Sequence, residues 1–128
     1  MADASTSFHE PVELLSSKTM ESRRGIATLL EEFEAIDWYD QRIDAAEDPR
    51  LRAILAHNRD EEKEHAMMTL EWLRRRDPVL DAEMRTYLFT EGDILAAEEA
   101  ATGNGNDTQG STPPADSSLG IGSLREDI

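Results

Sequence analysis

A glutamate and a histidine three residues apart, Glu62 and His65, are the side chains of this sequence best suited to hold a metal ion. Residues three apart are neighbours on a helix surface, so the carboxylate and the imidazole would project together. The pair offers a hard oxygen donor and a borderline nitrogen donor, which together suit a first-row transition metal. The ordinary alternative is that this charge-rich segment forms the solvent-exposed face of a helix.

The residues around the pair place it on the inward face of the predicted helix. At helical spacing it is flanked by a mostly apolar stripe: Leu51, Leu55, Asn58, Thr69 and Trp72, widened by Ile54, Ala66 and Leu73. A stripe of this kind points toward a core. A buried carboxylate is costly unless it is paired or bound to a metal, and the stripe contains no arginine. We therefore favour metal binding.

The composition indicates one small acidic domain. The chain has 128 residues, and its 28 acidic and 13 basic side chains give a formal net charge of -15. Such a field repels nucleic acid and concentrates cations, so we expect no nucleic-acid partner. There is no cysteine, which excludes disulfides, thiolate metal sites and cysteine nucleophiles. No apolar run approaches about 18 residues, and the N-terminus is polar, so we expect a cytoplasmic protein without a membrane span or signal peptide.

Apolar periodicity predicts an all-α fold whose main part is an antiparallel hairpin of two long helices. The first helix carries apolar residues at helical spacing over residues 12–43. Gly25 within it costs about 1 kcal/mol relative to alanine, which suggests close packing or a local bend there. Residues 44–49 form the turn, in which Asp48 is suited to cap a second helix over residues 49–76 and Pro49 is its first residue.

The remaining segments follow from capping signals and composition. Asp77 and Pro78 repeat the start of the second helix and predict a shorter helix over residues 79–90, and residues 94–101 add another turn or two. We divide the chain into a disordered N-terminus (1–8), a helical hairpin domain (9–100), a flexible linker rich in Gly, Asn, Ser and Pro (101–118) and a C-terminal docking peptide (119–128). Three aliphatic residues after a linker favour docking, and the alternative is an unstructured tail.

Glu32 is a second acid on an apolar helix face. It falls in the series Leu29, Glu32, Ile36, Tyr39 and Ile43. Di-iron helix bundles use one glutamate from each of two helices and a Glu-x-x-His motif from each of two others. This chain has one of each, so a two-fold dimer would complete both the two-metal site and a four-helix bundle. Tyr39, two turns from Glu32, could reach the metal with its hydroxyl.

Further acids and a histidine flank this inner face. They are Glu31 and Glu34, three residues apart, and His57, Glu61 and Glu64, at spacing i, i+4 and i+7. An exposed helix surface is the ordinary explanation, and we prefer it for Glu61 and Glu64 taken singly. The alternative is weaker cation sites that feed the central one, or ligands at a second subunit contact. Trp38 and Tyr39 are interpreted first as core aromatics.

Residues 31–42, 54–75 and 85–90 resemble the encapsulated ferritins. The C-terminal segment Leu119–Arg125 is similar to the peptide that docks such proteins inside an encapsulin shell. The resemblance implies a dimer that rebuilds a ferritin-like four-helix bundle, assembled further into a decamer of five dimers in the cytoplasm, inside an encapsulin compartment. It also implies ferroxidase activity, in which dioxygen oxidises Fe(II) and Fe(III) passes to the shell for storage.

The resemblance assigns roles by position. The iron ligands would be Glu32, Glu62 and His65, with Glu62 of both chains bridging two irons per dimer. The residues lining the site would be Trp38 and Tyr39. The site at which metal enters would consist of Glu31 and Glu34. A further peripheral metal site, with calcium or zinc as candidate ions, would consist of His57, Glu61 and Glu64.

The leading hypothesis is a di-iron ferroxidase that is active as a symmetric dimer within a larger ring. Two alternatives stay open. One is a non-enzymatic module in which metal ions merely hold the assembly together. The other is a different di-metal oxidoreductase, such as a peroxidase or a manganese catalase.

Overall fold

The computed structural model describes residues 8–107, with only the helical backbone given for residues 104–107. This part contains no strand and consists of helices: η2 (Val12–Leu14, a 3-10 turn), α1 (Ser17–Ala45), α2 (Pro49–Arg76), α3 (Pro78–Tyr87) and α4 (Ile94–Asp107). The predicted all-α class is confirmed. None of these helices is long and apolar enough to cross a membrane. The predicted docking peptide, and most of the N-terminal segment and linker, lie outside the described residues.

α1 starts later than the apolar pattern predicts. After η2, Ser16 caps the helix, because its hydroxyl oxygen accepts a hydrogen bond from the backbone N–H of Thr19 at 3.1 Å. The first turn of any helix leaves backbone N–H groups without a partner, and a serine at this position satisfies one of them. The expected start at Val12 was wrong because a capping side chain, rather than the apolar series, sets the helix boundary. Before η2, the ring of Phe8 lies 3.9 Å from the guanidinium carbon of Arg23.

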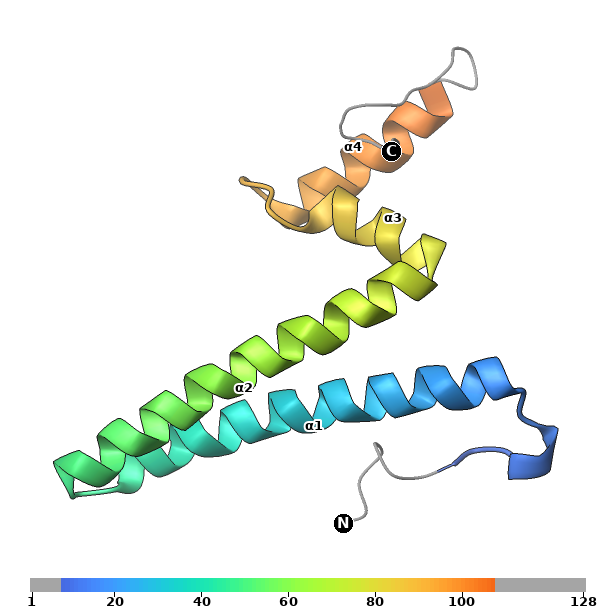
Figure 1. Ribbon diagram of the computed structural model, residues 1–128. Coiled ribbons are helices and arrows are strands. Elements are labelled where there is room, and N and C mark those ends of the chain that lie inside the picture. Colours follow the sequence, from blue (N-terminus) through green and yellow to red (C-terminus); the bar gives the residue numbers. More distant parts are fainter. Residues whose placement is uncertain (1–7, 108–128) are drawn as a thin grey trace. The chain divides into compact units, whose positions relative to one another are not determined.

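α1 and α2 form an antiparallel hairpin in which the two helices lie side by side (Figure 1). The turn between them ends at Asp48, whose Oδ1 accepts a hydrogen bond from the backbone N–H of Arg50 at 3.0 Å. Pro49 is the first residue of α2. Proline suits this position because its missing N–H would have had no partner there. The predicted start of the second helix is confirmed.

Two helices enclose little interior. Among the described residues only Ala66 and Leu73 are buried hydrophobic side chains, at 0% and 8% exposure. The predicted inner stripe of α2 is half-buried at Leu55, Asn58, Glu62, His65 and Thr69. Leu51 and Trp38, which we expected to face inward, are 45% and 48% exposed. Those two expectations were wrong because a single hairpin covers only the strip along which its helices face each other. Trp72 faces α1 as expected, although 39% of it stays exposed.

Large apolar side chains therefore remain on the surface of both helices. On α1 and α2 the side chains that are 47–58% exposed include Ile26, Leu30, Phe33, Ile54, Met67 and Met68. Contiguous exposed apolar surface is unusual for a monomer and marks sites of contact with other molecules. The hairpin thus has more apolar surface than it covers by itself.

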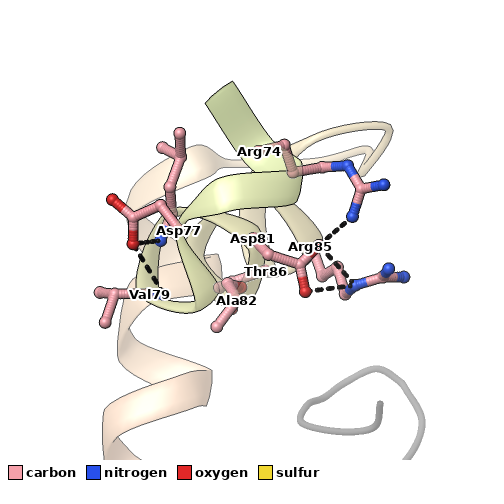
Figure 2. Close-up of polar contacts among 8 residues, drawn as sticks. Arg74, Asp77, Val79, Asp81, Ala82, Arg85 and Thr86 are labelled. Atoms are coloured by element: carbon pink, nitrogen blue, oxygen red, sulfur yellow. Dashed lines mark hydrogen bonds and ion pairs between the residues drawn. The ribbon is translucent and has the colours of Figure 1, made fainter. Parts of the chain in front are cut away.

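The described residues from Arg74 to Asp107 belong to a second compact unit. Asp77 caps α3 as predicted, accepting hydrogen bonds from two backbone N–H groups of its first turn at 3.0 and 3.1 Å (Figure 2). Asp81 accepts hydrogen bonds from Arg74 of α2 and Arg85 of α3. Burial acts to raise the pKa of Asp81, but these hydrogen bonds outweigh it and hold the pKa below the ordinary aspartate value.

α3 ends at Tyr87, three residues before the predicted boundary. Phe89 follows with φ of 61°, and Gly92 with φ of 88°. Such left-handed backbone cannot continue a right-handed helix, which is why the helix stops earlier than its apolar residues suggest. α4 starts at Ile94 and extends to Asp107, past the predicted linker boundary at residue 101.

Candidate metal centre

The inner face of α1 carries one acid in an apolar series. Leu29, Glu32, Ile36, Tyr39 and Ile43 are all half-buried, as their spacing predicts. The Oε1 atom of Glu32 is buried and has no hydrogen-bond partner in the described part of the chain. Burying a carboxylate oxygen without a donor is costly, because it gives up hydration without replacement. This oxygen keeps a lone pair that a cation would satisfy.

Glu62 and His65 lie together on α2, as their spacing predicts. Nδ1 of His65 is 3.7 Å from Oε1 of Glu62, and the two side chains are 45% and 27% exposed. This distance is too long for a hydrogen bond, so the carboxylate and the imidazole both remain available as metal ligands. An oxygen and a nitrogen on one helix face can therefore bind the same ion.

The donors of one chain do not complete a metal site. Over residues 8–103, no three histidine, aspartate or glutamate side chains are close enough to hold an ion together. The structure thus brings Glu62 and His65 together, while Glu32 does not join them in a three-ligand group. First-row metals take about four to six ligands, so a metal bound here needs donors from outside the single chain.

Tyr39 lies on the same face of α1 as Glu32. It is half-buried, and the guanidinium carbon of Arg42 is 5.5 Å from the centre of its ring. A cation at this distance attracts the face of an aromatic ring, which helps to orient Tyr39. Trp38 is the next residue back along the helix, and 100° of rotation per residue puts it on a more exposed face.

The candidates for peripheral metal binding lie on exposed surface. Nε2 of His57 is 3.2 Å from Oε2 of Glu61, with the side chains 69% and 53% exposed. Glu31, Glu34 and Glu64 are exposed as well. Within the part of the chain that the structure describes, no third ligand gathers with His57 and Glu61. Their binding of calcium or zinc stays a prediction.

An arginine beside the site was missed in reading the sequence. Arg59 lies one turn before Glu62 and is 25% exposed, so the stripe is not free of arginine as we had assumed. Its Nη1 donates to Oδ1 of Asp40 on α1 at 2.9 Å, and its Nε donates to Asp60 at 3.1 Å. These hydrogen bonds raise the pKa of Arg59, with Asp40 contributing most, and the hydrogen bond from Arg59 lowers the pKa of Asp60. The two aspartates thus engage the guanidinium beside Glu62.

The sequence could have revealed Arg59, because a residue three positions before Glu62 is its neighbour on the helix surface. It could not have revealed the partner of Arg59, because Asp40 is 19 residues away along the chain.

Comparison with known proteins places the chain in a family. Residues 7–91 match the family described as EncFtn-like. The chain is 59% identical over 129 residues to the encapsulated ferritin-like protein of Rhodospirillum rubrum, covering 98% of this chain and 92% of that one. It is 32% identical over 123 residues to the encapsulin nanocompartment cargo protein EncC of Myxococcus xanthus, covering 92% and 95%.

A solved structure supports the same assignment. A crystal structure of a protein from Nitrosomonas europaea is similar with a TM-score of 0.67 and 55% identity, covering 69% of this chain and 97% of that one. Sequence and fold therefore agree over the helical part of the chain. The chain belongs to the EncFtn-like family, that of the encapsulated ferritin-like proteins.

Proposed function

We propose that the chain is a ferroxidase, which oxidises Fe(II) to Fe(III) with dioxygen at a two-iron site shared by two copies of the chain. The observation that carries the proposal is the buried Oε1 atom of Glu32, which lacks a hydrogen-bond partner among the described residues. A carboxylate oxygen in this state is an unfilled ligand. Membership of the encapsulated ferritin-like family favours iron as the ion it receives.

The donors of the chain suit this chemistry. Glu32 and Glu62 are carboxylates, and a negative ligand attracts Fe(III) more strongly than Fe(II) because the ionic charge is larger. They would thus favour the oxidised product. His65 supplies a nitrogen ligand, and one imidazole per iron leaves coordination positions for dioxygen. Tyr39, half-buried on the same face as Glu32, would place its hydroxyl toward the same site.

A second copy would complete the ligand set. Each chain brings one glutamate on α1 and one Glu-x-x-His pair on α2, which is half of the ligand set of a di-iron bundle. A two-fold axis through the site would let Glu62 of both copies bridge the two irons. The exposed apolar side chains of α1 and α2 support such an assembly, since pairing would cover them. We extend this to a ring of five dimers, as the family resemblance implies.

We further propose that the protein works inside an encapsulin compartment, to which it delivers oxidised iron. The similarity to a protein named as encapsulin nanocompartment cargo supports this location. The segment Leu119–Arg125 would dock the chain to the shell, and it lies outside the described residues. Deletion of residues 119–128 should abolish co-purification with the shell protein while leaving the rate of iron oxidation unchanged.

The test of the catalytic site is the initial rate of Fe(II) oxidation in aerobic, fully assembled protein. Glu62→Gln and His65→Ala each remove a metal ligand. Substitution of a residue that only orients a ligand typically lowers metal affinity or activity by about 10–100-fold. Loss of a ligand itself should therefore lower the rate by at least about tenfold. Glu21→Gln is the matched control, because Glu21 is an exposed acid of α1 that pairs with Arg24 at 2.7 Å. Unchanged rates in both ligand variants would disprove the proposed site.

The alternative of a metal-dependent assembly module draws on the same exposed apolar side chains. In that case metal would join copies without turnover. Two measurements together distinguish the ferroxidase from the assembly module. They are native mass spectrometry of metal-free protein titrated anaerobically with Fe(II), and the oxidation assay. Even-numbered assemblies with about two irons per pair of chains and oxidation on addition of air support the ferroxidase. Assembly driven equally by Zn²⁺ and Fe(II), with no oxidation, would support the module instead.

A further inference from the structure

At Gly25, α1 lies close to side chains of α2. A Cβ atom built at Gly25 would lie 2.7 Å from Cζ3 and 3.0 Å from Cε3 of Trp72, and 3.2 Å from Cδ2 of Leu73. Ordinary contacts of this kind begin at 3.4 Å. The absence of a side chain at this position therefore permits the two helices to approach as they do, which explains the glycine that interrupts the helical pattern.

The candidate metal ligands lie between this contact and a second one. Gly25 precedes Glu32 by seven residues, and Trp72 follows His65 by seven, which is two helical turns in each case. On the other side of the ligands, Asp40 of α1 and Arg59 of α2 are joined at 2.9 Å. A steric contact and an ion pair thus hold the two helices on either side of the site.

We infer that Gly25 is a positioning residue for the metal site: with Trp72 it sets how closely α1 approaches α2, and hence where Glu32 lies relative to Glu62 and His65. This inference rests on the proposed function in one respect: it takes Glu32, Glu62 and His65 to be metal ligands. It assigns Gly25 no contact with metal or substrate.

The size of the expected displacement follows from the distances. An alanine at position 25 requires the contact with Cζ3 of Trp72 to lengthen from 2.7 Å to at least 3.4 Å. Trp72 is 39% exposed and its ring can give way in part, but Leu73 is 8% exposed and is enclosed. Part of the displacement must therefore be taken up by α1. Ligands tolerate errors of about 0.5 Å, so a shift of this order is enough to weaken binding.

Helix propensity predicts the opposite result. Alanine is a better helix former than glycine, so Gly→Ala in an open helix raises the melting temperature. Gly103 of α4 provides the matched control, because a Cβ atom there would meet nothing within 4 Å. Gly103→Ala should raise the melting temperature slightly or leave it unchanged, with no effect on metal binding. Gly25→Ala should lower it.

The experiment compares the wild type with Gly25→Ala, Trp72→Leu, the double variant and Gly103→Ala. Co²⁺ titration by visible absorption gives the metal affinity, circular dichroism gives the melting temperature, and the initial oxidation rate is recorded in parallel. Gly25→Ala should weaken Co²⁺ binding by about tenfold, the size typical of residues that position metal ligands. The double variant should recover part of the affinity and of the melting temperature, because leucine lacks the two ring atoms that the new Cβ would meet, while Cδ2 of Leu73 stays 3.2 Å away.

Co²⁺ affinities are compared at a temperature at which circular dichroism shows every variant to be fully folded, so a weaker affinity of Gly25→Ala there does not come from a general loss of stability. The inference is overturned if Gly25→Ala binds Co²⁺ like the wild type, or if the double variant binds as weakly as Gly25→Ala. The two proposals can fail separately. If the effects of Gly25→Ala and Trp72→Leu on Co²⁺ affinity are coupled but the wild type does not oxidise Fe(II), the ferroxidase proposal is overturned and the positioning role stands. If the wild type oxidises Fe(II) but the effects of Gly25→Ala and Trp72→Leu on Co²⁺ affinity simply add, the positioning role alone is overturned. A wild type that binds no Co²⁺ would overturn both.

Discussion

Replacing Glu32 by methionine should make the metal-free protein more stable. The wild type buries the Oε1 atom of Glu32 without a hydrogen-bond partner among the described residues. Methionine has a similar length, carries no charge and is a good helix former, so it can occupy the same half-buried position without that penalty. A residue kept for binding at the expense of stability is expected at a functional site.

The magnitude follows from the burial. An unsatisfied buried acceptor costs about 1–3 kcal/mol. Oε1 is the one oxygen of Glu32 that is buried without a partner, and the residue as a whole is only half-buried, so we take about 1–2 kcal/mol. In a domain of this size that corresponds to a rise in melting temperature of about 5 °C or more. A metal ion at about 100 times its dissociation constant stabilises the wild type by about 2.7 kcal/mol, so the order should reverse when metal is added.

The assay is thermal unfolding followed by circular dichroism, in a chelator and again with excess Co²⁺, at one protein concentration. Glu21→Met is the control, since Glu21 is exposed and its change should stay within about 0.5 kcal/mol. If Glu32→Met melts below the wild type in the chelator while the control does not, then Oε1 has a partner in solution. That result would remove the observation on which the metal site rests.

Two further predictions concern the ion pairs. The pKa of Asp81 is held below 3.8 by Arg85 and Arg74 against the effect of burial, so its stabilising contribution is full above that pH and is lost as the pH falls through the lowered pKa. Thermal unfolding between neutral pH and about pH 2 should therefore show a smaller loss of stability in Asp81→Asn than in the wild type, and equal losses would contradict the assignment. The pair of Asp40 and Arg59 should show a small favourable coupling in a double-mutant cycle with Asp40→Asn and Arg59→Met. High salt should weaken that coupling because the carboxylate is 53% exposed, and a coupling of zero at low salt would show that the pair does not hold the helices.

Several features of the protein were determined by short stretches of its sequence. The start of α2 at Asp48 and Pro49, and the cap of α3 at Asp77, depend on residues within three or four positions of each other, so the local signal was sufficient. The helix face that Glu32 shares with its apolar neighbours on α1, and the closeness of Glu62 and His65 on α2, follow from helical spacing alone. Local geometry repeats every turn and needs no partner helix.

The tertiary structure decided what depends on the approach of one helix to another. It paired Asp40 with Arg59 across 19 residues of sequence, and it set Gly25 against Trp72 and Leu73. It also left part of the apolar stripe exposed, because how much of a helix is covered depends on the neighbour that packs on it. Periodicity gives the direction of a side chain around its own helix axis, whereas the distance to a residue on another helix depends on how the whole hairpin packs.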